Sequence, residues 1–161
     1  LRFPENEKVD KRVYPERIQV NCFTTKNGKR SEVALTIYGK PAVRLPESYW
    51  LSFTVPGIES VIAEKMGERV NLMVEKGNRQ MHGIDRYVDL ITSGETIRIS
   101  SKEAFLLNVG EAQGLNYSTN YPDKRKGVHF NLNNNLWGTN FSMWNEGSRT
   151  YHFVIETLSR K

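Results

Sequence analysis

The sequence is poor in the residue patterns that most metal, cofactor and nucleotide sites require. It has a single cysteine, Cys22, so no internal disulfide can form. The three histidines, His82, His129 and His152, lie far apart, without an HExxH, His-x-His or paired-cysteine motif. No glycine-rich loop of the nucleotide-binding type follows a strand pattern. We therefore expect no metal and no cofactor bound by this chain alone.

Long apolar runs and an activated nucleophile are missing as well. No apolar run approaches the roughly 18 residues that a membrane-spanning helix needs, which predicts a soluble protein with no membrane partner. No nucleophile-elbow motif surrounds a serine. Cys22 lies in the strand-like stretch IQVNCF, where we interpret it as a small core residue rather than a nucleophile.

The net charge of +5 is confined to the front of the chain. The first 46 residues carry ten Lys and Arg against five Asp and Glu, whereas the remaining 115 residues carry thirteen of each. We interpret this excess as a solvated front segment and not as a track for phosphates. No nucleic-acid partner is expected.

Alternation of apolar and polar residues dominates the chain and is typical of strands with one buried face. In residues 17–24, Ile18, Val20 and Cys22 share the side that we expect to face the core. The following Asn27-Gly28 predicts a hairpin with a type I′ turn, because both residues tolerate positive φ. Further strands are expected at 32–39, 49–55, 70–75, 84–91, 95–100, 104–109, 127–132 and 150–157.

These patterns predict an all-β protein, an antiparallel β-sandwich of about nine strands with at most one short helix. Residues 56–67, PGIESVIAEKMG, fit either that helix, between Pro56 and Gly67, or an irregular strand. No repeat or low-complexity linker interrupts the chain. We therefore expect residues 1–161 to form a single domain.

The most unusual stretch is FNLNNNLWGTNFSMW, residues 130–144. It holds five asparagines, two tryptophans and two phenylalanines without a charge. Indole rings stack on the apolar faces of sugars, and amides exchange hydrogen bonds with hydroxyl groups. Asparagine also favours turns, and tryptophan favours cores, so a structural role competes with sugar binding. The stretch KGNRQMHG, residues 76–83, presents the same two alternatives. The candidate carbohydrate contacts are Trp137, Asn135, Asn140, Trp144, Arg79 and His82.

Glu47, in RLPESYW, is the most distinctive acidic residue. A glycoside hydrolase places two carboxyl groups roughly 5 to 10 Å apart, an arrangement that sequence alone does not reveal. We favour an ion pair between Glu47 and a neighbouring arginine such as Arg44 over a catalytic role.

Three stretches in order, KPAVRLPESYWLSF, KGNRQMHG and GVHFNLNNNLWGTNFSMW, carry a family resemblance. They resemble the closing β domain of a group of uncharacterised proteins similar to the α-mannosidase-like, family 38 glycoside hydrolases. The resemblance covers residues 39–156, and its last motif is the most specific. Residues 1–38, the front strands, match no motif of the family.

The resemblance implies that the chain is the C-terminal part of a larger glycoside hydrolase. In that family a carboxylate nucleophile, a carboxylic acid and a divalent metal lie mainly in an N-terminal α/β domain, which this sequence does not contain. The partners implied are therefore that catalytic domain, on the same polypeptide, and carbohydrate. No catalytic residue is expected in this chain, which agrees with the missing initiator methionine.

Two alternatives remain beside this supporting role. The chain could be a free-standing carbohydrate-binding module that uses Trp137 or Trp144 as a stacking platform, or it could itself be a hydrolase. For the long motif, we favour a structural explanation over a sugar-binding surface. In that explanation the aromatic side chains form the core, and the asparagines cap backbone groups that a bulged strand leaves unpaired.

Overall fold

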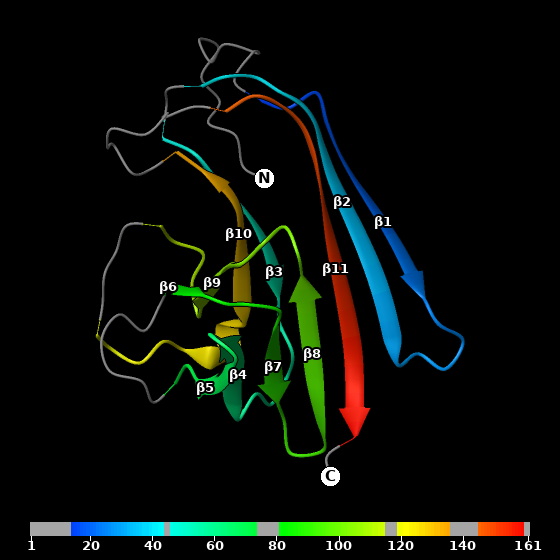
Figure 1. Ribbon diagram of the computed structural model, residues 1–161, viewed down its shortest axis with the longest axis vertical. Helices are drawn as coiled ribbons and strands as arrows, with labels where there is room; N and C mark the ends of the chain where they lie inside the picture. The colour runs from blue at the N-terminus through cyan, green and yellow to red at the C-terminus, as the bar shows by residue number, and fades with distance from the viewer. Residues whose placement is uncertain (1–13, 44–45, 74–80, 115–118, 136–144, 160–161) are drawn as a thin grey trace.

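The structure is a computed structural model that describes residues 14–43, 46–73, 81–114, 119–135 and 145–159 (Figure 1). These residues form eleven antiparallel strands and one 3-10 turn, η2 (Lys124–Lys126), and they include no α-helix. No helix long and apolar enough to cross a membrane is therefore found among them. The prediction of an all-β antiparallel fold is confirmed, with two strands more than expected.

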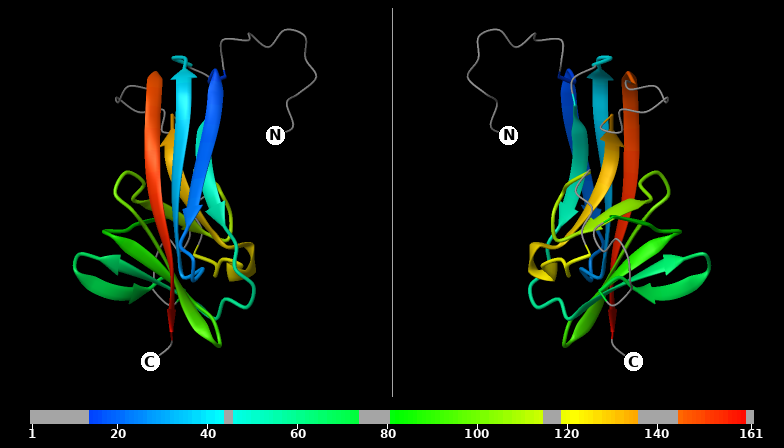
Figure 2. Two further views of the ribbon diagram at one scale, coloured as in Figure 1. Left: turned by 90° about the vertical axis from the view of Figure 1, so that its right-hand side faces the viewer. Right: turned by 90° about the vertical axis from the view of Figure 1, so that its left-hand side faces the viewer.

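The strands form two sheets that pack face to face, and the larger sheet is strongly twisted (Figures 1 and 2). In spatial order, the large sheet consists of β1 (Arg17–Thr24), β2 (Arg30–Lys40), β11 (Gly147–Ser159), β8 (Glu95–Ser101), β7 (Tyr87–Ile91), β4 (Ser60–Lys65) and β5 (Glu68–Asn71). The small sheet consists of β3 (Ser48–Phe53), β10 (Val128–Asn134), β9 (Leu106–Val109) and β6 (Met81–Gly83).

Residues 56–67 contain a strand and not a helix. Val61 and Ala63, two positions apart on β4, are both fully buried against the core, which is the period of a strand. At the end of β4, Met66 and Gly67 have φ values of 53° and 82°. Two successive positive φ angles are what a type I′ hairpin requires, and this turn connects β4 to β5.

The first hairpin is present, but its turn differs from the prediction. Only Gly28 has a positive φ, of 68°, so the turn is not of type I′. A five-residue loop separates β1 from β2, and the Gly28 amide donates to the Thr25 carbonyl at 2.9 Å. Asn27 contributes through its side chain instead, because its Oδ1 accepts from Thr25 Oγ1 at 2.8 Å and from the Lys29 amide at 3.1 Å.

The expectation that β1 turns a face into the core is wrong. Ile18 and Val20 are 45% and 56% exposed, and Cys22 is an exposed free cysteine rather than a small core residue. The alternation itself is real, since Ile18 lies opposite Ile37 and Val20 opposite Leu35 of β2. The large sheet has seven strands and the small sheet four, and the buried core includes residues of β2 but none of β1.

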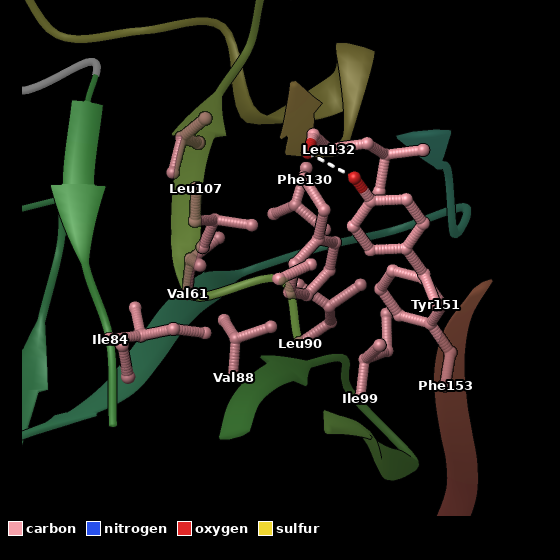
Figure 3. Close-up of a cluster of buried hydrophobic side chains, with 14 of the residues drawn as sticks. Val61, Ile84, Val88, Leu90, Ile99, Leu107, Phe130, Leu132, Tyr151 and Phe153 are labelled. Atoms are coloured by element: carbon pink, nitrogen blue, oxygen red, sulfur yellow. Dashed lines mark hydrogen bonds between the residues drawn. The ribbon is translucent and has the colours of Figure 1, made fainter. Parts of the chain in front are cut away.

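The core lies between the sheets and includes the fully buried Phe130 and Phe153 (Figure 3). The ring of Phe153, on β11, lies 5.2 Å from that of Phe130, on β10, in an edge-to-face arrangement. Phe53, on β3, completes the group at 5.6 Å from Phe153 and 5.8 Å from Phe130. Tyr151 donates its hydroxyl proton to the Leu132 carbonyl at 2.6 Å, so this buried polar group is also satisfied.

A pair of Phe→Ala substitutions tests this core. Phe153→Ala empties a site that is 1% exposed and should lower the free energy of unfolding by about 3–5 kcal/mol. Phe23→Ala, at a side chain that is 67% exposed, should change it by less than about 0.5 kcal/mol. Urea unfolding followed by circular dichroism gives both values. Equal losses at the two positions would contradict the assigned core.

Candidate functional site

Two of the six predicted carbohydrate contacts lie within the described residues. These are Asn135 and His82; Trp137, Asn140, Trp144 and Arg79 lie outside them. His82 is buried on β6 and lies opposite the fully buried Leu107. Since β9 separates β6 from β10, the structure does not bring His82 and Asn135 together.

Asn135 acts as a clamp on a neighbouring segment of backbone. Its Oδ1 accepts from the Glu47 amide at 2.7 Å, and its Nδ2 donates to the Val43 carbonyl at 3.0 Å. Its own amide donates to the Glu47 carbonyl at 3.1 Å. The buried side chain therefore satisfies backbone groups of the connection between β2 and β3, which have no sheet partner there.

The asparagine-rich end of β10 contains an irregularity. Its register against β3 shifts between Asn131 and Asn133, as at a β-bulge. Asn134 Nδ2 donates to Asn131 Oδ1 at 2.7 Å across the shift. Together with the Asn135 clamp, this geometry favours the structural explanation for the described part of the motif.

A buried ion pair lies beside the clamp. Lys40 Nζ is 2.5 Å from Glu47 Oε1, and the two side chains are 6% and 15% exposed. Glu47 Oε1 accepts no hydrogen bond, so this contact is an ion pair. The ammonium also donates to the carbonyls of Pro41 at 3.1 Å and Asn145 at 2.9 Å. Among the described residues, the partner of Glu47 is Lys40, at the end of β2. The expected partner, Arg44, lies outside the described residues, so that pairing stays a prediction.

These contacts hold the two described residues that flank positions 136–144. Asn135 precedes that segment, and Asn145 follows it; Asn145 Nδ2 donates to Asn133 Oδ1 at 2.5 Å. We call Lys40, Glu47, Asn133, Asn135 and Asn145 the asparagine junction. The hollow beside it is about 50 Å³, enough for one or two water molecules but not for a sugar ring. The described junction is therefore a support and not itself a binding pocket.

Tyr49 adds a titratable group to the junction. Its hydroxyl donates to Glu47 Oε2 at 3.4 Å. Burial raises the pKa of Tyr49 to about 12, and the negative charge of Glu47 and this hydrogen bond act in the same direction. The neutral phenol is therefore the form that the folded protein favours.

No sequence pattern singled out Glu64 and Asp89, the two most buried carboxylates of the described residues. Glu64 on β4 is held by Arg86, whose hydrogen bonds lower the pKa of Glu64. Asp89 on β7 is 1% exposed and accepts from Arg98 at 2.8 and 2.9 Å and from Arg69 at 3.1 Å. Each of the two carboxylates is thus bound directly by arginine, which is the arrangement of a structural ion pair.

An open depression of about 770 Å³ lies on the large sheet beside β8 and β11, where His152 and Glu103 meet. His152 Nδ1 is 3.1 Å from Glu103 Oε1. Burial acts to raise the pKa of Glu103, but hydrogen bonds from the backbone and ring of His152 outweigh it, so the pKa is lowered. No serine or cysteine side chain of the described part bonds His152, so the pair lacks the nucleophile of a triad.

Comparison of the sequence with known proteins does not assign the chain to a family. No protein-family model matches the chain, and no curated protein is significantly similar to it. Among the described residues, no three His, Cys, Asp or Glu side chains come together as metal ligands would. The divalent metal implied by the family resemblance therefore has no set of ligands in the described part of this chain.

A double-mutant cycle tests the ion pair. Lys40→Met and Glu47→Gln each leave one buried charge without its partner and should each lower the free energy of unfolding by about 3–5 kcal/mol. The double variant should lose at least about 1 kcal/mol less than the sum of the two. Lys126→Met, which removes an exposed pair with Glu111, should cost less than about 1 kcal/mol. Additive losses at Lys40 and Glu47, measured by urea unfolding, would show that the charges do not interact.

The raised pKa of Tyr49 predicts a loss of stability in alkali. Its ordinary value is 10.0 and its folded value about 12. The stabilising contribution is therefore complete below about pH 10 and is lost as the pH rises through about 12. Tyr49→Phe should remove about 1–3 kcal/mol of this loss. Urea unfolding between pH 9 and 12, with absorbance titration at 295 nm, measures it. An unchanged pH profile in Tyr49→Phe would assign the loss to other groups.

Proposed function

We propose that the chain is a non-catalytic β-sandwich domain that presents residues 136–144 to the active site of a glycoside hydrolase. In this proposal the parent protein is α-mannosidase-like, and its catalytic carboxylates and divalent metal lie in an N-terminal domain. The observation that carries the proposal is the asparagine junction. It holds both ends of the segment with a buried ion pair and amide hydrogen bonds.

The asparagine junction would serve sugar binding by holding the residues that flank positions 136–144. A loop that contributes to sugar binding loses less entropy on binding when its ends are already fixed. Asn135 and Asn145 provide those fixed ends, and the segment between them has the tryptophans and amide that suit sugar faces and hydroxyls. Trp137, Asn140 and Trp144 are therefore the residues assigned to the contact with sugar.

The pairing of the buried carboxylates supports the part of the proposal that gives this chain no catalytic role. The two buried acids of the large sheet, Glu64 and Asp89, are bound by arginines, and Glu47 is paired with Lys40. Each of these three carboxylates already has a cationic partner, which is the arrangement of a structural ion pair. The reacting carboxylates are therefore assigned to the preceding domain.

Turnover by two polypeptides tests the proposal. The 161-residue chain should not hydrolyse 4-nitrophenyl α-mannoside, whereas a longer polypeptide that includes the sequence encoded before it should. In the longer polypeptide, Trp137→Ala should lower kcat/KM at least about tenfold, the loss of roughly 1.4 kcal/mol of transition-state binding. Tyr121→Ala, at an exposed ring on the described surface, is the matched control and should have no effect.

Two results would overturn the proposal. Hydrolysis by the 161-residue chain, abolished by Glu47→Gln with the fold intact, would make the chain itself the enzyme. Binding of mannose oligosaccharides by the isolated chain, with a change in tryptophan fluorescence that Trp137→Ala or Trp144→Ala removes, would instead make it a free-standing carbohydrate-binding module. Calorimetry on the isolated chain distinguishes this second result.

A further inference from the structure

No described strand pairs with the outer edge of β1. β1 is the terminal strand of the large sheet and pairs, within the described part of the chain, with β2 alone. Its register runs without a shift from Arg17 opposite Tyr38 to Thr24 opposite Ser31. Such a regular strand presents a row of unpaired amides and carbonyls along its free side, which is the surface that a further strand recognises.

β1 also lacks the features that usually protect an edge. Edge strands are commonly short, bulged, or interrupted by lysine, proline or inward-pointing charges. β5, at the opposite edge of the same sheet, has four residues including Glu68 and Arg69. β1 has eight residues, no bulge and no proline, and its only charge is at Arg17.

The side chains of β1 offer an uncovered apolar face. Ile18, Val20 and Cys22 continue the face that β2 turns to the core with Leu35 and Ile37, yet all three are exposed. On the opposite face, Phe23 is 67% exposed. A partner strand would need apolar side chains on one face only and no cation opposite Arg17.

We propose that this partner is β1 of a second copy, paired antiparallel about a twofold axis at Val20. A twofold contact brings the same surface together from both copies, so the strand must complement itself. Centred on Val20, the pairing sets Val20 against Val20, Ile18 against Cys22, and Gln19 against Asn21. Arg17 then lies opposite Phe23, where a cation can rest on the ring, and no two like charges meet.

Other registers are less favourable. A shift by one residue would place the apolar face of one copy on the polar face of the other. A shift by two residues, centred on Asn21, would set Ile18 against Thr24 and Gln19 against Phe23, so that two polar–apolar mismatches replace matched pairs. A centre at Gln19 would pair only Arg17 to Asn21, five of the eight residues, so Val20 is the centre that pairs the most of β1 without such mismatches.

The dimer should be weak. Stable complexes bury about 1,200–2,000 Å² in total, and one pair of eight-residue strands is small on that scale. We expect an equilibrium that shifts to the dimer as the protein concentration rises. This inference does not depend on the proposed function, because it uses neither residues 136–144 nor the junction.

Sedimentation of the 161-residue chain tests the dimer. The wild type should show a dimer whose fraction rises with concentration. Val20→Lys places two ammonium groups opposite each other across the axis and should leave only monomer. Gln19→Lys adds the same charge to the other face of the strand, opposite Asn21, and should retain the dimer. Thermal unfolding should be unchanged in both variants, since both positions are on β1 outside the core.

Disulfide trapping tests the register. In a Cys22→Ser background, Val20→Cys places two thiols opposite each other, and either kind of antiparallel pair brings the Cα atoms to a distance that a disulfide spans, about 4.5–5.5 Å. Oxidation to a linked dimer should be at least about tenfold faster than for Gln19→Cys in that background, because pairing raises the effective thiol concentration.

A wild type that is monomeric at every concentration, a dimer that survives Val20→Lys, or equal oxidation rates would overturn the proposal.

Discussion

The contact on which the site most depends is the buried ion pair between Lys40 and Glu47. Lys40 ends β2 in the large sheet, and Glu47 lies directly before β3 in the small sheet. Through the hydrogen bonds of Lys40 and Glu47, the same unit reaches Asn145, before β11, and Asn135, after β10. The asparagine junction therefore connects both sheets through Asn135 and Asn145, which flank residues 136–144 in the sequence. Burying two charged groups carries a desolvation penalty. The attraction between them and the hydrogen bonds of the ammonium to two carbonyls offset much of that penalty.

The second constraint on the structure is the difference in size between the two sheets, because a four-stranded sheet does not cover all of a seven-stranded one. The small sheet closes the core over the strands that carry Phe153, Ile99 and Leu90, but β1 contributes nothing to that core. Burial and hydrogen bonding are thus distributed unevenly: the core is closed at its centre, while no described strand pairs with the outer edge of β1. The junction and this edge are separate features, one internal and one external, and they lead to separate conclusions.

The fold was predictable to the extent that its signals are local. Alternation along 17–24, 95–100 and 150–157 identified strands, and Asn27-Gly28 identified a hairpin, because side-chain period and turn chemistry act over a few residues. Residues 56–67 stayed ambiguous since the short run ESVIAEK fits both periods, and contact with the core decided for β4. The exposure of Ile18 and Cys22 was not predictable, because it depends on where the second sheet ends.

The site was less predictable, for a related reason. The sequence pointed to the asparagines, but the role of Asn135 depends on Val43 and Glu47, roughly ninety positions away. The pairing of Glu47 with Lys40 was not predicted, because it depends on how the chain turns between β2 and β3. Hydrogen exchange gives the most direct test of the junction as one unit that fixes residues 136–144. The amides of Glu47 and Asn135 should be protected together in the wild type, and Lys40→Met should reduce their protection by the same factor while the amides of β11 stay protected. Independent exchange of the two amides, or protection that Lys40→Met leaves unchanged, would contradict the account.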